Sequence, residues 1–148
     1  NTRMKLLKRC FDYVEERIRS AENAITSAKE ASQDDTKSSA GDKYETTREM
    51  MQQEVSRNEA QLYEAGKLKH VLSQISANIT SEVVQNGSLV ITNYGNFFIA
   101  ISAGQIEADG LSYYAVSAAS PIGKKLAGLK KGDQFGFANK EYEILEVY

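Results

Sequence analysis

Apolar side chains recur at alternating intervals of three and four residues near the start of this 148-residue chain. The series consists of Met4, Leu7, Phe11, Val14, Ile18, Ala21, Ile25 and Ala28. An unbroken run of this period predicts one long helix with a narrow apolar stripe. At about 1.5 Å per residue the helix would extend about 42 Å, which is longer than a small globular domain needs. The stripe therefore requires another helix to cover it.

A second helix follows, with a less regular stripe. Its members are Tyr44, Met51, Val55, Leu62, Ala65, Leu68, Leu72 and Ile75. Asn58 falls inside this stripe, where a polar residue can fix the register of two helices. Residues 31–41 contain no large apolar side chain and form the predicted turn, after which Asp42 and Glu45 have the spacing of a capping pair. Residues 1–77 are therefore predicted to form an antiparallel coiled-coil hairpin. An intermolecular coiled coil is the alternative.

After residue 77 the period changes to short runs of β-branched and aromatic residues separated by Gly, Asn and Asp. The runs cover residues 83–84, 89–91, 96–101, 111–116, 134–137 and 141–147. Residues 120–129 fit one short helix, with Ser120 as its N-cap, Pro121 at its first position and Gly128 near its end. We therefore expect an α+β protein, in which the second domain, residues 78–148, is a small antiparallel sheet with one short helix.

Composition limits the function classes. The formal net charge of −2 gives no electrostatic indication of nucleic-acid binding, and neither half of the chain is a polybasic arm. Cys10 is the only cysteine, so no intramolecular disulfide can form, and no apolar run approaches the roughly 20 residues that span a bilayer. We expect a soluble cytoplasmic protein that does not contact a membrane. Cys10 and His70 lack the neighbours that a nucleophile or a zinc site requires.

One segment carries a family resemblance. Residues 120–133 read SPIGKKLAGLKKGD, and the chain closes with YEILEVY at residues 142–148. These motifs, placed after a helical hairpin, resemble the C-terminal domain of the bacterial Gre-type transcript-cleavage factors. The resemblance implies an FKBP-like fold for residues 78–148. The sequence match to the family is close over residues 112–148 and loose over residues 78–111. Residues 1–77 match the family only in their architecture, a helical hairpin.

The resemblance also implies a function. Gre-type factors dock their β domain at the rim of the secondary channel of bacterial RNA polymerase and insert the hairpin toward the active centre. Two carboxylates at the hairpin tip then help to hold the second catalytic Mg²⁺, which suits a hard cation that keeps most of its waters. By this resemblance the protein is not itself an enzyme and has no cofactor beyond the polymerase's Mg²⁺. It would be a monomer that meets DNA and RNA only within the elongation complex.

The tip departs from the family pattern. When the tyrosine of the family's tip motif is aligned with Tyr44, Lys37 and Ala40 occupy the positions of the two carboxylates. Asp34, Asp35 and Asp42 are the nearby candidates for assisting Mg²⁺. They are equally interpretable as turn and helix-cap residues. The factor would therefore either stimulate cleavage with substitute carboxylates or bind the channel and regulate transcription without cleavage.

Ser120, Pro121 and Ile122 are the candidate polymerase-binding residues by the same resemblance. Ala119 stands where the family often has Asp or Asn, so the expected contact is small and mainly apolar. Lys124, Lys125, Lys130 and Lys131 form a basic cluster nearby that would face acidic protein, RNA or only solvent. Two other classes stay open: a peptidyl-prolyl isomerase using the aromatic residues of the sheet, and a stand-alone coiled-coil interaction protein.

Overall fold

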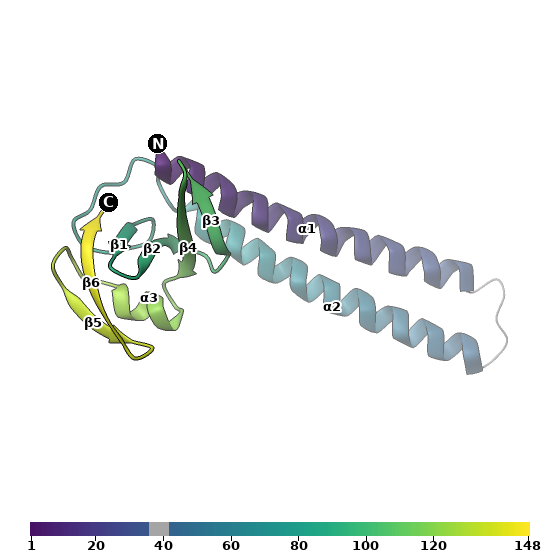
Figure 1. Cartoon of the computed structure of the whole chain (residues 1–148). Helices are drawn as coiled ribbons and strands as arrows, with labels where there is room; N and C mark the ends of the chain where they lie inside the picture. The colour runs from purple at the N-terminus through teal and green to yellow at the C-terminus, as the bar shows by residue number, and fades with distance from the viewer. Residues whose placement is uncertain (36–41) are drawn as a thin grey trace. The chain divides into compact units, whose positions relative to one another are not determined.

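A computed structural model describes the backbone of residues 1–35 and 42–148 and the side chains of residues 1–31 and 45–148. Two long helices precede a sheet and a short helix (Figure 1). The elements are α1 (Thr2–Asp35), α2 (Asp42–Ser73), β1 (Leu89–Thr92), β2 (Gly95–Ala100), β3 (Gly104–Ala108), β4 (Leu111–Ser117), α3 (Pro121–Leu126), β5 (Gln134–Phe137) and β6 (Lys140–Val147). The predicted α+β class with its N-terminal hairpin is confirmed.

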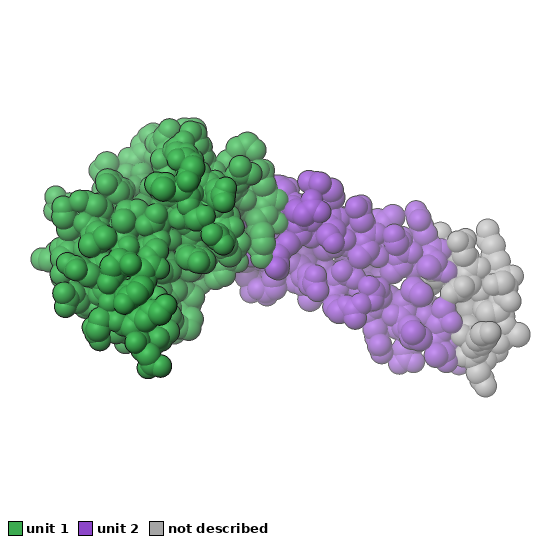
Figure 2. Space-filling model, viewed as in Figure 1, with its two compact units in different colours: residues 1–13, 69–148 green, residues 14–68 purple. Residues whose placement is uncertain are grey.

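The chain forms two compact units (Figure 2). Residues 14–68 make up one, and residues 1–13 with 69–148 make up the other. Both long helices therefore contribute to each unit. The domain boundary predicted at residue 77 lies shortly after the end of α2 at Ser73, and the division into domains 1–77 and 78–148 stays a prediction. None of the described helices is long and apolar enough to span a membrane.

The unit of residues 14–68 is the antiparallel helix pair. Val14, Ala21 and Ala28 are buried at the spacing that the sequence predicts for α1, and Ala65 is buried on α2. Asn58 is buried as predicted, with 8% of its surface exposed. Its amide donates to the Glu54 carbonyl oxygen at 2.8 Å, which is a bond within α2. The apolar stripe of α1 is therefore covered by α2 of the same chain. A role of Asn58 in fixing the register of the two helices stays a prediction.

The sheet has six strands in the order β3-β4-β2-β1-β6-β5. Four neighbouring pairs are antiparallel, but β2 and β4 run parallel, so the wholly antiparallel sheet that we predicted is wrong for this pair. The cause is β3, which the sequence did not predict. It pairs with the far side of β4, so that β4 returns beside β2 in the same direction. Val83, predicted to start a strand, makes only an isolated bridge to Lys130.

One face of the sheet carries an apolar core. Its buried members are Val84, Val90, Phe97, Ile99, Leu126, Tyr142 and Ile144. The Tyr142 ring stacks on Phe135, with ring centroids 5.0 Å apart, and meets Tyr94 edge-on at 5.1 Å. On β4, Tyr113 is buried while Tyr114 is 45% exposed, which follows the alternation of side chains along a strand. Most of the aromatic residues therefore serve packing.

The first turns of α1 belong to the sheet unit, and they bury only part of the predicted stripe: Leu7 is buried as predicted, with 8% of its surface exposed. Met4, the first stripe residue, is 56% exposed, so its predicted burial is wrong. Leu6 and Cys10 are fully buried instead. Burial raises the pKa of the Cys10 thiol to about 12, because the thiolate would lose its hydration. Cys10 is thus a protonated packing residue at neutral pH.

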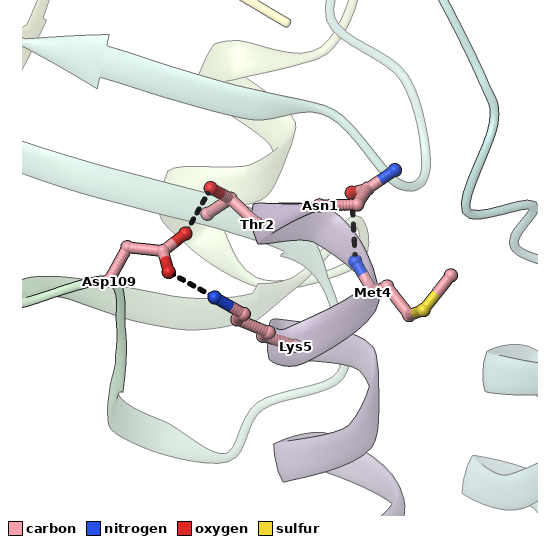
Figure 3. A network of polar contacts seen from close by, with 5 residues as sticks. All are labelled: Asn1, Thr2, Met4, Lys5 and Asp109. Carbon is pink, nitrogen blue, oxygen red and sulfur yellow. Dashed lines mark hydrogen bonds and ion pairs between the residues drawn. The ribbon is translucent and has the colours of Figure 1, made fainter.

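A polar network holds the first turn of α1 to the turn between β3 and β4 (Figure 3). Thr2 Oγ1 donates to Asp109 Oδ2 at 2.7 Å, and Lys5 forms an ion pair with the other carboxylate oxygen. Asn1 caps the helix by accepting from the Met4 backbone N–H at 3.1 Å. Asp109 itself has φ of 54°, the left-handed conformation that Asp and Asn tolerate in a tight hairpin turn.

We expect this network to add acid-sensitive stability. The hydrogen bond from Lys5, followed by the one from Thr2, holds the pKa of Asp109 below its usual range. A carboxyl with a depressed folded-state pKa stabilises the fold above its unfolded pKa of about 4, and this contribution is lost as the pH falls through the folded value. Urea unfolding should therefore separate wild type from Asp109→Asn at neutral pH, and the difference should shrink below about pH 4. A pH-independent difference would contradict the assignment.

Candidate functional site

The predicted docking residues lie at the start of α3, and Ser120 is its N-cap. The Ser120 backbone is extended, with φ of −68° and ψ of 160°, and its Oγ accepts from the Gly123 N–H at 3.1 Å. The same hydroxyl donates to the Ser117 carbonyl oxygen at 2.6 Å. Pro121 occupies the first helical turn, where a missing N–H costs nothing. The predicted cap is confirmed, and it occupies the Ser120 hydroxyl.

Gly123 fixes how closely α3 approaches the end of β4. A Cβ built on Gly123 would stand 2.0 Å from the Ser117 carbonyl oxygen and 3.0 Å from Ala118 Cα. Both neighbours are backbone atoms, which cannot rotate away as a side chain could. The first turn of α3 therefore rests directly on the segment that leaves the sheet.

Pro121 and Ile122 differ in how far their side chains are exposed to solvent. Pro121 is exposed, whereas Ile122 is half-buried and packs against the core of the sheet. The end of α3 is also as expected, since Gly128 has φ of 80° and the Ala127 N–H donates to the Gly123 carbonyl oxygen. The structure brings the three predicted residues together on one short helix start, with Pro121 as the exposed apolar group.

The four lysines of the predicted basic cluster are all exposed. Lys124 and Lys125 lie in the last turn of α3, where positive charge is favourable. Lys131 Nζ contacts Glu146 Oε1 at 2.7 Å, and this hydrogen bond raises the pKa of Lys131. Asp133 Oδ2 accepts from the Lys130 backbone N–H at 2.9 Å, which confirms the predicted tight turn. One of the four charges is thus already compensated within the chain.

Comparison with protein-family models, curated proteins and solved structures finds no match to this chain. The family assignment therefore rests on the motifs quoted above and on the order of hairpin and sheet. It stays a proposal.

The candidate metal-assisting residues lie around the hairpin turn. Asp34 and Asp35 end α1, and Asp42 begins α2. Their side chains, and residues 36–41 altogether, lie outside the described part of the chain. In the part that is described, no group of three or more His, Cys, Asp or Glu residues could hold a metal ion. Assistance to Mg²⁺ by Asp34, Asp35 or Asp42 stays a prediction.

Sequence reasoning missed one notable residue, Arg3. It lies in the first turn of α1 with only 8% of its surface exposed. A basic residue at the positive end of a helix is unfavourable, and that turn contains no acidic residue. These two facts are visible in the sequence once the helix start is known, and they could have singled out Arg3.

Removal of the N-cap of α3 should lower the stability of the protein moderately. Ser120→Ala deletes the acceptor for the Gly123 N–H and the donor to Ser117, and we expect it to lower the free energy of unfolding by about 1 kcal/mol. Ser120→Asp restores an acceptor at the N-cap and should recover most of the loss. Thermal and urea unfolding of the two variants measure this. If Ser120→Ala and Ser120→Asp destabilise the protein equally, capping of α3 is not the source of the stability that Ser120 provides.

Proposed function

We propose that this protein is a Gre-type transcription factor that binds bacterial RNA polymerase. In this proposal the sheet unit docks through the start of α3, and the helix pair reaches into the secondary channel to modulate elongation or transcript cleavage. The observation that carries the proposal is the local structure of residues 120–133. The motif there has the local structure that the sequence predicts: a serine cap, a proline start, a glycine end and a lysine-rich tight turn.

The physical character of the docking residues supports a small apolar contact. The Ser120 hydroxyl already has two partners, so it has little left to offer another protein. Pro121 presents a rigid ring on an ordered helix start, so its burial costs little conformational entropy. The neighbouring lysines supply charge that would speed association with an acidic surface.

Two experiments test the proposal. In the first, purified protein is mixed with bacterial RNA polymerase and with stalled, backtracked elongation complexes, and co-elution and RNA cleavage are followed. Co-elution supports the proposal, and its absence overturns it. Cleavage that exceeds the intrinsic rate and is lost in the Asp34→Ala, Asp35→Ala double variant identifies substitute carboxylates.

Binding without stimulated cleavage identifies a channel-binding regulator. The residues aligned with the family's carboxylates favour this second candidate, because Lys37 and Ala40 cannot hold a metal.

The second experiment localises the contact. Pro121→Glu places a charge at the proposed interface while an acidic residue remains acceptable in the first turn of a helix. We expect it to weaken polymerase binding by about tenfold or more, because a buried unpaired charge costs more than 1.4 kcal/mol. Leu111→Glu makes the same kind of change at another exposed apolar residue of the sheet, where 53% of the side chain is accessible. Equal weakening by both variants would remove the start of α3 as the docking site.

A further inference from the structure

Arg3 is a buried cation with no ion-pair partner among the described side chains. Its Nε donates to the Gly87 carbonyl oxygen at 2.8 Å. The ion pairs found among the described side chains do not include it, and burial lowers the pKa of its guanidinium, which nevertheless stays charged at neutral pH. A buried charge of this kind is costly unless something compensates it.

The partner of Arg3 is itself tightly held. Gly87 has φ of 92°, and a Cβ there would stand 2.9 Å from Ile75 Cγ2. Gly87 is therefore fixed in place, and among the described contacts its carbonyl oxygen accepts from the guanidinium through Nε alone. Arginine has five such donors in a planar fork, so the terminal nitrogens retain the capacity to bind an oxyanion.

The Arg3 side chain lines a cavity of about 360 Å³. Ile79, Val147 and Tyr148 form its apolar walls, and residues 80–82 complete it. The Ser81 hydroxyl is occupied by the backbone of Val83, to which it donates at 2.7 Å. The cavity thus combines one partly desolvated cation with mainly apolar surroundings, which is the usual composition of a small-molecule site.

We propose that this cavity binds a small organic monocarboxylate. The carboxylate would accept two parallel hydrogen bonds from the Arg3 guanidinium, which is the geometry that arginine matches best. The hydrocarbon part would lie against Ile79, Val147 and Tyr148. The location at the positive end of α1 adds to the attraction for an anion.

Glu82 sets the charge of the ligand. It lines the same cavity and is exposed, so its carboxylate adds a negative charge at the rim. The single positive charge of Arg3 matches one negative charge on a ligand, whereas the second charge of an anion such as phosphate would face Glu82 without a matching cation in the lining. The apolar walls offer phosphate nothing in return. The cavity therefore selects for a single charge joined to an apolar group, and this inference is independent of the proposed role in transcription.

Benzoate is a suitable probe. Titration of the full chain with sodium benzoate, followed by amide NMR at constant ionic strength, should give saturable shifts grouped at residues 79–82, 87 and 147–148. Benzamide, which has the same ring without the charge, should give none of them. Phosphate should bind at least tenfold more weakly than benzoate. These titrations need only the wild-type chain. Benzoate shifts that are scattered or do not saturate, or equal shifts with benzamide, would overturn the proposal.

Two arginine variants locate the cation. Arg3→Gln should weaken benzoate binding by about tenfold or more, which is what charge-assisted hydrogen bonds contribute. Arg9→Gln removes an exposed arginine from the same helix and should leave binding unchanged. Unchanged binding in a folded Arg3→Gln variant would sink the assignment. If that variant does not fold, the mapped shifts and the benzamide comparison in wild type still decide it.

Discussion

Gly123→Ala should lower the free energy of unfolding of the sheet unit by about 1–3 kcal/mol, the usual cost of adding a carbon to a filled space. An added methyl would stand 2.0 Å from the Ser117 carbonyl oxygen, far inside van der Waals contact. Alanine is the better helix former by about 1 kcal/mol, so intrinsic propensity predicts the opposite sign. The clash outweighs propensity because the obstacle is backbone. Relief requires α3 to move off the end of β4, which would also displace the proposed docking residues.

Gly66→Ala is the matched control. Gly66 also lies within a helix, α2, but no atom outside its own helix stands within 4 Å of the added carbon. Here only propensity acts, and we expect a gain of about 0.5–1 kcal/mol. The same substitution at two helical glycines should therefore give opposite signs in urea unfolding. Stabilisation by both would show that the approach of α3 to β4 is looser than the structure indicates.

Local chemistry explains what the sequence could predict. The start of α3 follows from Ser120 and Pro121, and its end follows from Gly128, because caps and turns depend on residues a few positions apart. The seam from Val14 onward was also predictable, since one period governs it through Ala28.

Long-range pairing explains what the sequence could not predict. β3 carries only one large apolar residue, Ile106, so its sequence lacks the alternation of a half-buried strand. Without β3, the direction of β4 relative to β2 could not be deduced, and an antiparallel sheet was the simpler expectation. The pocket beside Arg3 is likewise built from residues 3, 79–82 and 147–148, which are brought together only by folding. No local pattern could have indicated it.

The candidate site residues likewise divide into those that a local motif can indicate and those that it cannot. The three residues at the start of α3 adjoin one another in sequence, so a motif could find them. The carboxylates around the hairpin turn are different, because their use depends on which side chain stands at the apex. Asp34, Asp35 and Asp42 are separated by a turn whose register the sequence does not determine. Their role therefore depends on the cleavage experiment.

The first turns of α1 give the second large prediction. Met4 continues the three-four series, but the helix buries Leu6 completely and leaves Met4 56% exposed. The series fails at Met4, although Leu7 is buried, because these turns pack within the sheet unit and no longer within the helix pair. We therefore expect Leu6→Ala to lower the free energy of unfolding by about 2–5 kcal/mol, the cost of a lost side chain plus the cavity it leaves.

Met4→Ala should change stability by less than about 0.5 kcal/mol, because an exposed methionine and an alanine have similar helix propensities. The two variants remove comparable apolar volume two positions apart on one helix, so helix formation itself cannot account for a difference between them. Their midpoints of urea unfolding therefore report which face of α1 is covered, provided that the dependence of the unfolding free energy on urea concentration is the same in both variants. A larger loss from Met4→Ala than from Leu6→Ala would restore the unbroken stripe and would mean that the first turns of α1 continue the helix seam.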